Sequence, residues 1–428
     1  MKVIKLFFTL AIITVMFALL SSVIANAQAA YTQQISGVAT SLNSVSAIND
    51  NDAWICGNAG VVLRTTNSGV LWSRVTSPAP TVDLYNIYGI EQGTALVTGS
   101  TATGTFVYRT TTAGSAWTTV FSQTGGFIDA IWMKDTLNGF MYGDPVGGRW
   151  SLWRTTNGGV SWDSTGLNLQ RATGNEAGYN NSLFISGSNI WFGTNNTKIY
   201  YSSNNGTNWT SQTTTGQSDI PALWFNTVTR GLAGGTQVIQ TSNSGAAWNP
   251  MTTSGTGSVT GITGLGMKFW MTRQGPSIYY TSDDGIAWAN AYTLAGATYT
   301  HLQFARTTGS SSGTFWAVTS TGQITRYGLA TGITPINSNV VTNYSLSQNY
   351  PNPFNPSTKI SFAIPHSGFT TLKIYSMDGR EVASLLNEDL TVGNYQITFN
   401  AASLSSGMYF YKLQSGSFVE TKKMTLVK

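Results

Sequence analysis

The sequence predicts an all-β protein in which a seven-bladed β-propeller is followed by a small Ig-like β-sandwich. Three observations predict this fold class: a phrase ending in Trp that recurs six times, a short strand phrase that recurs seven times, and an unusual composition. Only 9% of residues are charged and 46 are glycine. Such a composition is typical of an all-β extracellular protein with many turns.

The Trp-ended phrase sets the period of the chain. One copy, Arg154–Trp162, reads R-T-T-N-G-G-V-S-W, and the copies end at Trp72, Trp117, Trp162, Trp209, Trp248 and Trp288. Their spacings are 45, 45, 47, 39 and 40 residues, and a period of this length predicts a propeller or a solenoid. A solenoid needs polar caps at both ends. Neither end of this repeat resembles a cap, which favours a ring.

Each copy contains the residues of a tight turn between two strands. A hydroxyl residue stands seven before the Trp, Gly stands three before it, and Asn or Asp stands five before it except at Thr112. Asn and Asp bond their own backbone in turns, and Gly permits a positive φ. We expect the Trp to fill the seam against the neighbouring unit. The structural residues assigned on this basis are Thr65, Asn67, Gly69, Trp72, Thr110, Gly114, Trp117, Thr155, Asn157, Gly159, Trp162, Ser202, Asn204, Gly206, Trp209, Thr241, Asn243, Gly245, Trp248, Thr281, Asp283, Gly285 and Trp288.

This phrase resembles the Asp-box, or BNR repeat, of sialidases, sortilin-type receptors, xyloglucanases and photosystem II assembly-factor-like propellers. The family pattern is Ser/Thr-x-Asp-x-Gly-x-x-Trp. Asn mostly replaces Asp here, so no metal is assigned to it. The resemblance implies a fold and says little about function, because the box is structural in the family and lies away from the ligand face.

The propeller is predicted over residues 28–328, with four strands in each unit. In the second unit these are Leu84–Ile90, Ala95–Thr98, Phe106–Arg109 and Trp117–Phe121. Phrases such as W-I-C-G and L-V-T-G mark a second strand seven times, but there are only six boxes. The last unit stops after its third strand. We therefore expect Tyr31–Ser36, with Tyr31 in the place of Trp, to supply the missing outer strand and close the ring.

Charge and rare residues exclude several classes of function. The net charge of +5 divides into +2 for residues 1–27, +1 for the middle and +2 for residues 344–428, so no basic field supports nucleic-acid binding. The single cysteine, Cys56, lies in an apolar strand and is expected to be buried. With His301 and His366 as the only histidines, no three-histidine metal site exists. We predict no metal and no cofactor.

The first residues of the chain have the pattern of a targeting segment. Residues 1–27 combine Lys2 and Lys5, an apolar core and an Ala-Asn-Ala cleavage site, which together predict a signal peptide. We expect no transmembrane segment in the mature chain. Residues 329–343 are predicted to be an exposed linker.

Residues 344–428 form a second domain of short strands, including Thr371–Tyr375, Glu381–Leu385, Tyr395–Phe399, Gly407–Leu413 and Phe418–Leu426. The segment resembles the type A C-terminal sorting domain of the type IX secretion system. The matching runs are Y-P-N-P-F from Tyr350, I-Y-S-M-D-G-R ending at Arg380, S-G-M-Y from Ser406 and the closing K-M-T-L-V-K. The resemblance implies type IX secretion machinery as partner, a Bacteroidetes-type bacterium, removal of the domain and lipopolysaccharide attachment.

A ligand site is predicted where two long polar loops meet between the third and fourth blades. These loops and the nearby inner strand contribute Asp129, Asp144, Arg149, Arg171, Glu176 and Tyr179. Asp144 and Glu176 are the pair that could act as acid and nucleophile or base on a glycosidic bond. Three arginines recur, as in sialidases, but Arg64, Arg109 and Arg154 lie on third strands just before the turn, on the wrong face for catalysis.

These observations favour a secreted or cell-surface propeller that binds a glycan or a protein without catalysis. The alternative is a glycoside hydrolase acting on extracellular polysaccharide. A second alternative, an envelope assembly factor, follows from the resemblance to the photosystem assembly-factor-like propellers.

Overall fold

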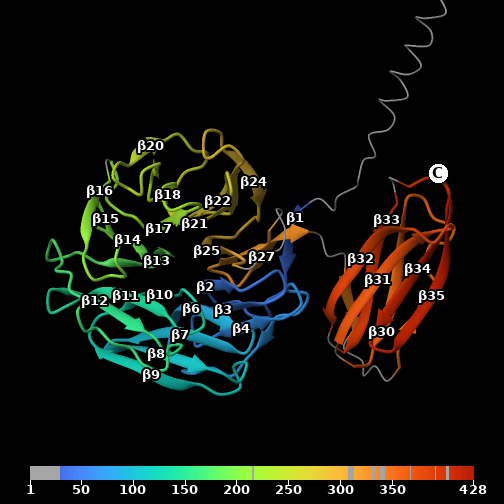
Figure 1. Ribbon diagram of the computed structural model, residues 1–428, viewed down its shortest axis with the longest axis horizontal. Helices are drawn as coiled ribbons and strands as arrows, with labels where there is room; N and C mark the ends of the chain where they lie inside the picture. The colour runs from blue at the N-terminus through green and yellow to red at the C-terminus, as the bar shows by residue number, and fades with distance from the viewer. Residues whose placement is uncertain are drawn as a thin grey trace, which may run out of the picture. The chain divides into compact units, whose positions relative to one another are not determined.

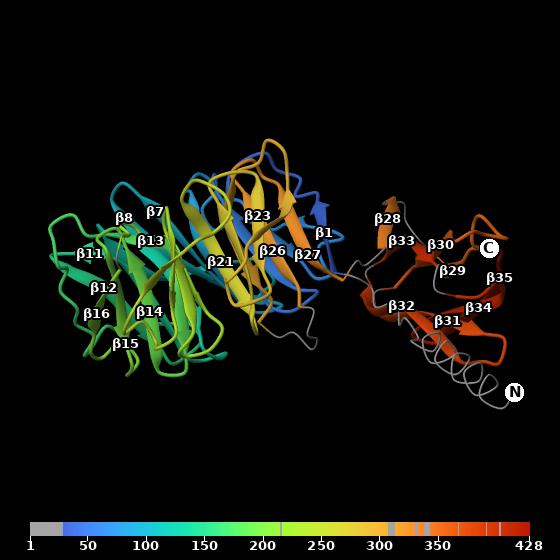
Figure 2. The same cartoon turned by 90° about the horizontal axis from the view of Figure 1, so that it is seen from above.

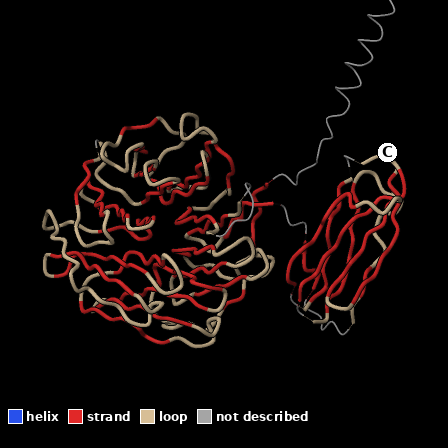
Figure 3. Tube along the Cα trace, in the orientation of Figure 1, coloured by secondary structure: helices blue, strands red, loops and turns tan. Residues whose placement is uncertain are grey.

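The computed structural model describes residues 29–214, 216–306, 313–329, 333–337, 343–366, 368–390, 392–401 and 404–428. The predicted signal peptide, residues 1–27, lies outside these ranges. All regular structure in the described ranges is β-strand (Figure 3). None of the described segments forms an apolar helix of membrane-spanning length. The chain divides into two compact units, Ala30–Leu329 and a second that contains Ala330–Lys428.

The first unit is the predicted seven-bladed propeller. Its inner strands surround the centre of the ring (Figure 1). Blades one to four are β2 (Leu42–Ala47), β3 (Ala53–Gly57), β4 (Val62–Thr65) and β5 (Ser73–Arg74); β6 (Leu84–Glu91), β7 (Thr94–Thr101), β8 (Gly104–Thr110) and β9 (Thr118–Thr124); β10 (Ile128–Met133), β11 (Gly139–Val146) and β12 (Arg149–Thr155); and β13 (Gly178–Ser186), β14 (Asn189–Thr194), β15 (Lys198–Ser202) and β16 (Thr210–Thr213).

Three further blades complete the ring. They are β17 (Ala222–Phe225), β18 (Gly231–Gly234), β19 (Val238–Thr241) and β20 (Asn249–Met251); β21 (Val259–Leu265), β22 (Lys268–Arg273), β23 (Ser277–Thr281) and β24 (Ala289–Thr293); and β25 (Tyr299–Phe304), β26 (Phe315–Thr319), β27 (Ile324–Leu329) and β1 (Ala29–Gln34). The second strands are buried along most of their length and carry large aromatic side chains of the core, Trp54, Trp191, Trp270 and Trp316. Cys56 is buried among them, as predicted.

The third blade differs from the expected four strands. Its described sheet has three, β10-β11-β12. The chain that follows pairs its backbone with β12 only at isolated bridges, Arg154 with Asp163 and Arg149 with Gln170. Between them the Asp163 carboxylate caps a turn by accepting the Thr165 N–H at 2.9 Å, and Gly166 has a positive φ of 76°. This turn interrupts the ladder, so a regular outer strand does not form.

The N-terminal strand closes the ring, as the sequence predicts. β1 pairs with β27 as the outer strand of the seventh blade. Tyr31 occupies the place of Trp: its hydroxyl accepts a hydrogen bond from Trp270 Nε1 at 3.1 Å, and its ring stacks on Tyr292 with centroids 5.1 Å apart. Trp270 belongs to the sixth blade, so β1 joins the last two blades. β1 thereby covers the edge of β27, which would otherwise lack a partner on that side.

Gln34, three residues after Tyr31, binds the seventh blade to the first. Gln34 Nε2 donates to the Ser68 carbonyl at 2.7 Å, and Gln34 Oε1 accepts from Trp72 Nε1 at 2.9 Å and from Trp316 Nε1 at 3.0 Å. Gln212, three after Trp209, repeats this arrangement on Ser244 and Trp248. Gln34 and Gln212 each lie three residues after an aromatic residue and make equivalent contacts, which supports the placement of Tyr31 at the position that Trp209 holds.

The six Trp-ended phrases form turns held by their own side chains. In the first, the Thr65 hydroxyl accepts the Gly69 N–H at 2.9 Å and lies 3.0 Å from Asn67 Oδ1, which accepts the Leu71 N–H. Asn157, Asn204, Asn243 and Asp283 repeat the role of Asn67. Thr112 replaces it with a hydroxyl that accepts the Ala116 N–H at 3.0 Å. A short polar acceptor suffices at this position.

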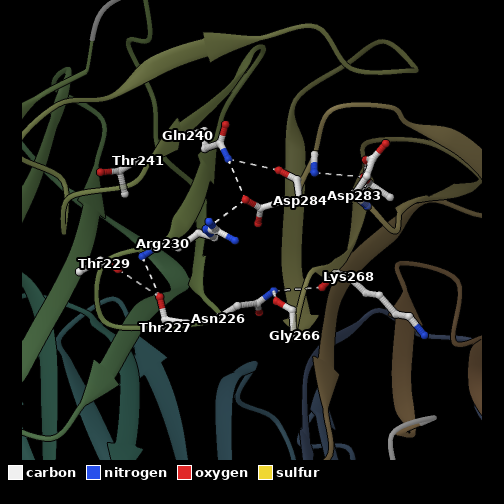
Figure 4. A network of polar contacts seen from close by, with 12 residues as sticks. Asn226, Thr227, Thr229, Arg230, Gln240, Thr241, Gly266, Lys268, Asp283 and Asp284 are labelled. Carbon is white, nitrogen blue, oxygen red and sulfur yellow. Dashed lines mark hydrogen bonds and ion pairs between the residues drawn. The ribbon is translucent and has the colours of Figure 1, made fainter.

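The turns also bind neighbouring blades together. At the seam between the fifth and sixth blades, Gln240 Nε2 donates to the Asp284 carbonyl at 3.2 Å and Arg230 Nε lies 3.0 Å from the Asp284 carboxylate (Figure 4). The Arg109 guanidinium similarly donates to the Gly158 carbonyl at 2.8 Å. Arg109 therefore serves the seam between blades, in keeping with its prediction as a residue of the repeat.

The glycine of the turn is required for packing as well as for its φ. A Cβ on Gly245 would lie 1.9 Å from Gln212 Oε1, and Gly245 has a φ of 87°. On Gly69, a Cβ would lie 1.9 Å from Gln34 Oε1. The outer strand of the preceding blade therefore lies directly against the turn. The sequence predicted the need for a positive φ at this glycine, but not its close packing against the preceding blade.

Gly245→Ala is expected to lower the free energy of unfolding by about 2–4 kcal/mol, because it adds steric conflict to an unfavourable φ. Gly266→Ala is the matched control: its φ is 64° and nothing lies within 4 Å of the added Cβ. We expect about 1 kcal/mol there. Denaturant unfolding followed by Trp fluorescence measures both. Equal losses would show that packing against Gln212 contributes nothing.

The second unit is a sandwich of two four-stranded sheets, visible as two layers in Figure 2. Its core includes Ile360, Leu372, Tyr411 and Met424. One sheet has the order β28-β33-β30-β29 and the other β32-β31-β34-β35. The strands are β28 (Ile333–Asn337), β29 (Ser345–Leu346), β30 (Ser357–Ile364), β31 (Gly368–Ser376), β32 (Glu381–Leu390), β33 (Gly393–Asn400), β34 (Gly407–Ser415) and β35 (Phe418–Leu426).

The segment predicted as a linker, residues 329–343, is corrected at its centre. Residues 333–337 form β28, which pairs with β33 at the edge of the sandwich. Pro335 concealed this strand in the sequence, since proline lacks the N–H of a ladder. An edge strand tolerates that loss because one of its sides has no partner.

Candidate ligand-binding site

The axis of the propeller is crossed near one face by a polar insertion, residues 179–182, which we call the plug. It lies between Gly178, which pairs with Thr194, and Leu183, which pairs with Phe192, so the inner strand is longer here than its partner. Asn181, with a φ of 66°, reaches the first and second blades: its Oδ1 accepts from Ser44 Oγ at 2.7 Å and from Asn86 Nδ2 at 2.6 Å.

Neighbouring contacts hold the plug across the ring. Asn180 Nδ2 donates to the Tyr85 carbonyl at 2.6 Å, and Asn181 Nδ2 donates to the Asn43 carbonyl at 3.1 Å. Below the plug the channel retains a cavity of about 20 Å³, lined in part by His301. Burial lowers the pKa of His301 to about 3, so its neutral Nδ1 accepts the Val45 N–H at 3.2 Å. The plug thus blocks this end of the axis.

Three of the predicted site residues anchor the plug. Asp144 Oδ1 accepts the Gly178 N–H at 2.8 Å. The Tyr179 hydroxyl donates to Asp219 Oδ1 at 2.5 Å. Glu176 is buried, and its carboxylate accepts the Ala172 N–H at 2.6 Å and the Tyr200 hydroxyl at 3.1 Å. The structure therefore brings these residues to one region, but each carboxylate is engaged by a different protein partner.

Asp129 lies beside Asp144 in an unusual setting. Its side chain is buried, and Oδ2 has no hydrogen-bond partner. A Cβ on Gly178 would lie 2.3 Å from this oxygen. Burial raises the pKa of Asp129 well above its usual value, and the negative charge of Asp144 adds to the effect. Burial likewise raises the pKa of Asp144, against the opposing Gly178 N–H.

The two predicted arginines remain at the surface. Arg149 and Arg171 are both exposed. Their loops meet through the Arg171 N–H, which donates to the Gly148 carbonyl at 3.0 Å. The Arg171 guanidinium donates to the Gly174 carbonyl within its own loop at 2.8 Å. The predicted rim therefore exists as paired loops, and its residues make local contacts that stabilise the loops.

A second feature lies at the opposite end of the axis, where the inner strands end. A cavity of about 530 Å³, which we call the cup, opens there, within the size range of ligand pockets. Its walls include the aromatic side chains Tyr88, Trp132, Phe184, Trp224 and Phe304. Trp132 is the centre of this cluster, with ring centroids 5.4 Å from Phe184 and 6.3 Å from Trp224.

Four of the five aromatic walls arise from one position in the repeat. Tyr88, Trp132, Phe184 and Trp224 pair in the same register with Leu96, Phe140, Trp191 and Leu232 of the second strands. Ser46, Thr263 and Gln303 hold this position in the other three blades, and Phe304 lies one residue after Gln303. Sequence reasoning missed the cup, although aligning the inner strands would have shown an aromatic residue at this position four times in seven.

The cup and the plug lie on opposite faces of the ring. The plug contacts the beginnings of inner strands, whereas the cup is formed by their ends. The Trp-ended turns lie on the same face as the cup, as shown by the Ser68 hydroxyl, which donates to the carbonyl of Asp50 in the loop after β2. The predicted site residues belong to the plug face.

Comparison with known proteins gives the same architecture. Residues 348–427 match the secretion system C-terminal sorting domain, and residues 28–139 match the photosynthesis system II assembly factor YCF48. The chain is therefore a β-propeller whose first part is similar to YCF48, followed by a domain similar to secretion-system C-terminal sorting domains. A sorting domain of this kind indicates export by a secretion system.

Solved structures share the fold of the propeller. YCF48 bound to D1 peptide aligns with a TM-score of 0.53 and 16% identity, over 71% of this chain and 97% of its own. YCF48 from Cyanidioschyzon merolae gives 0.55 and 16%, over 70% and 99%. The WD40 β-propeller domain of Doa1 gives 0.54 and 13%, over 70% and 97%. No curated protein sequence matches the chain.

Proposed function

We propose that the YCF48-like propeller is a non-catalytic binding or scaffold protein, delivered to the cell surface or secreted, with a protein or glycan as ligand. The single observation that carries the proposal is the cup at one end of the propeller axis, which has a volume of about 530 Å³ and five aromatic side chains in its walls. Aromatic side chains supply large contact areas for both peptides and sugars. The solved YCF48 with a D1 peptide favours a protein ligand and keeps an envelope assembly role as a second candidate.

The route to the surface is part of the proposal. Residues 1–27 would direct the chain to the periplasm, and residues 344–428 would engage the type IX machinery before their removal. Attachment to lipopolysaccharide would then tether residues 28–328. The match of residues 348–427 to the sorting domain supports this order of events.

The contacts of the carboxylates argue against the glycosidase alternative. A retaining or inverting mechanism needs two carboxylates that face one substrate. Asp144 instead accepts the Gly178 N–H, while Glu176 accepts from Ala172 and Tyr200. Both therefore serve the loops around the plug.

The experiment compares binding with hydrolysis in the full chain. We expect no cleavage across a panel of extracellular polysaccharides, and unchanged glycan-array and envelope-protein binding in Asp144→Asn and Glu176→Gln. Trp132→Ala should weaken that binding by about tenfold or more. Leu137→Ala, which alters an exposed side chain outside the cup, should leave it unchanged. Polysaccharide cleavage that disappears in both carboxylate variants would establish the hydrolase instead.

A further inference from the structure

Arg306 places a buried positive charge at the wall of the cup. Its guanidinium lies over the Tyr88 ring, 4.2 Å from the centroid, and Nη1 donates to Ser46 Oγ at 2.9 Å. Nη2 donates to the Gly89 carbonyl. These contacts use one hydrogen on each terminal nitrogen, so a guanidinium held in this way retains further N–H donors. Its side chain remains partly accessible and lines the cup.

No carboxylate compensates this charge within the described propeller. The ion pairs found there and in the sandwich involve other residues, Arg230 with Asp284, Lys373 with Glu381 and Lys422 with Glu420. Asp135 lines the cup but makes no ion pair with Arg306. The sequence between Arg306 and Gly313 contains no acidic residue. The Tyr88 hydroxyl is occupied as a donor to the Met133 carbonyl at 2.6 Å.

A buried cation without a counterion is costly unless an anion binds to it. Desolvation accordingly lowers the pKa of Arg306 from its ordinary value, and no neighbouring carboxylate opposes this shift. Beside the guanidinium, the walls are aromatic: Tyr88 lies beneath it and Phe304 is two residues before it, with Trp132 and Trp224 completing the apolar surface. A ligand that suits both features carries an anionic group next to an apolar body.

We infer that the cup binds a hydrophobic carboxylate, with its carboxylate paired to the Arg306 guanidinium and its aromatic or aliphatic body against Trp132, Phe184 and Trp224. This inference rests on the proposed binding function and specifies the ligand class. The planar guanidinium suits bidentate pairing with a carboxylate, and its stacking on Tyr88 fixes the orientation of its donors. The carboxylate can belong to a free organic acid or to the end of a peptide.

The test uses the full chain and Trp fluorescence, checked by calorimetry. The probes are 3-phenylpropionate, its neutral amide, glucuronate, and a tripeptide ending in Phe with a free or an amidated terminus. We expect 3-phenylpropionate to bind about tenfold or more tightly than its amide and than glucuronate. A tighter free-terminus tripeptide would identify a peptide source, and tighter 3-phenylpropionate a free acid. Equal binding of acid and amide, or of glucuronate and 3-phenylpropionate, would overturn the inference.

Variants locate the effect at Arg306. Arg306→Gln should abolish the preference for the acid over the amide, while Arg306→Lys should retain part of it and keeps the test valid if the Gln variant does not fold. Arg74→Gln, an exposed arginine on β5 outside the cup, is the matched control and should bind as the parent does. An acid preference that persists in Arg306→Lys and Arg306→Gln alike would contradict the assignment. If the parent binds its envelope or glycan ligand but none of the probe acids, this inference fails and the proposed function stands.

Discussion

Gln34→Ala is expected to lower the free energy of unfolding of the propeller by about 2–4 kcal/mol, as the largest effect of any single hydrogen-bonding side chain at the ring closure. Removal of this amide leaves the buried indole N–H groups of Trp72 and Trp316 without partners, and the Ser68 carbonyl as well. Because β1 is the strand that joins the two ends of the ring, we also expect faster proteolysis of the N-terminal segment.

The neighbouring Gln33→Ala variant is the matched control, because that side chain is exposed on the same strand. It should unfold as the parent does. Gln212→Ala removes the equivalent clasp between the fourth and fifth blades, where the chain is continuous, and should cost less than Gln34→Ala. Denaturant unfolding and limited proteolysis measure these differences. A Gln34→Ala protein as stable as Gln33→Ala would show that this clasp does not hold the ring closed.

Asp129→Asn is expected to raise the free energy of unfolding by about 1–3 kcal/mol at pH 7. At the same strand position in other blades, Asn43 Nδ2 donates to the Leu84 carbonyl at 2.8 Å and Thr300 Oγ1 donates to the Leu42 carbonyl at 2.5 Å. Each acceptor is the first residue of the next inner strand, which after Asp129 is Gly178. An ionised Asp129 has no hydrogen to donate, whereas Asn restores a donor.

The pH dependence of this stability difference follows from the raised pKa of Asp129. Burial raises the pKa of folded Asp129, so the folded state retains a proton that the unfolded chain releases near its ordinary pKa of about 4. The stability of the parent relative to Asp129→Asn is therefore greatest below about pH 4 and falls as the pH rises toward the folded pKa. Thermal unfolding of both proteins between pH 3 and 9 measures the difference.

Asp163→Asn is the control, because the pKa of Asp163 is lowered in the folded protein and that of Asp129 is raised. Asp163 is exposed, and hydrogen bonds from Thr165 lower its pKa, so its contribution to stability is present at neutral pH and is lost in acid. The Asp163→Asn protein should show no gain at pH 7. A neutral-pH loss of stability in Asp129→Asn, or a difference that does not change with pH, would contradict the proposed environment of Asp129.

Much of the fold could be predicted because the repeat is local. The spacing of Trp72 to Trp288 fixes the blade period, and the missing seventh box identifies Tyr31 as the closing residue. The outer strand of the third blade was predicted and is absent, because the Asp163 turn competes locally with the ladder. β28 was missed because Pro335 is an unfavourable strand residue except at an edge.

The candidate site was harder to predict because polar residues of this kind can either bind a ligand or stabilise a loop. Asp144, Glu176 and Tyr179 were predicted to form a ligand site, but a cluster of polar residues has the same appearance in the sequence whether it binds a ligand or holds a loop. Their hydrogen bonds to Gly178, Tyr200 and Asp219 assign them to the loops around the plug. The aromatic residues of the cup resembled ordinary core residues, since a single aromatic residue in an inner strand is no signal until the blades converge on the axis.

The sequence by itself determined the blade period and the separate character of residues 344–428, because each depends on a local pattern along the chain. It also indicated closure of the ring by Tyr31, because the last repeat lacks its own outer strand. Only the tertiary structure decided which face of the axis is open. That outcome depends on Asn181 meeting Ser44, residues 137 positions apart, and on Arg306 reaching Ser46 and Tyr88 across the ring closure. Such contacts are set by the geometry of the closed ring, which no local pattern contains.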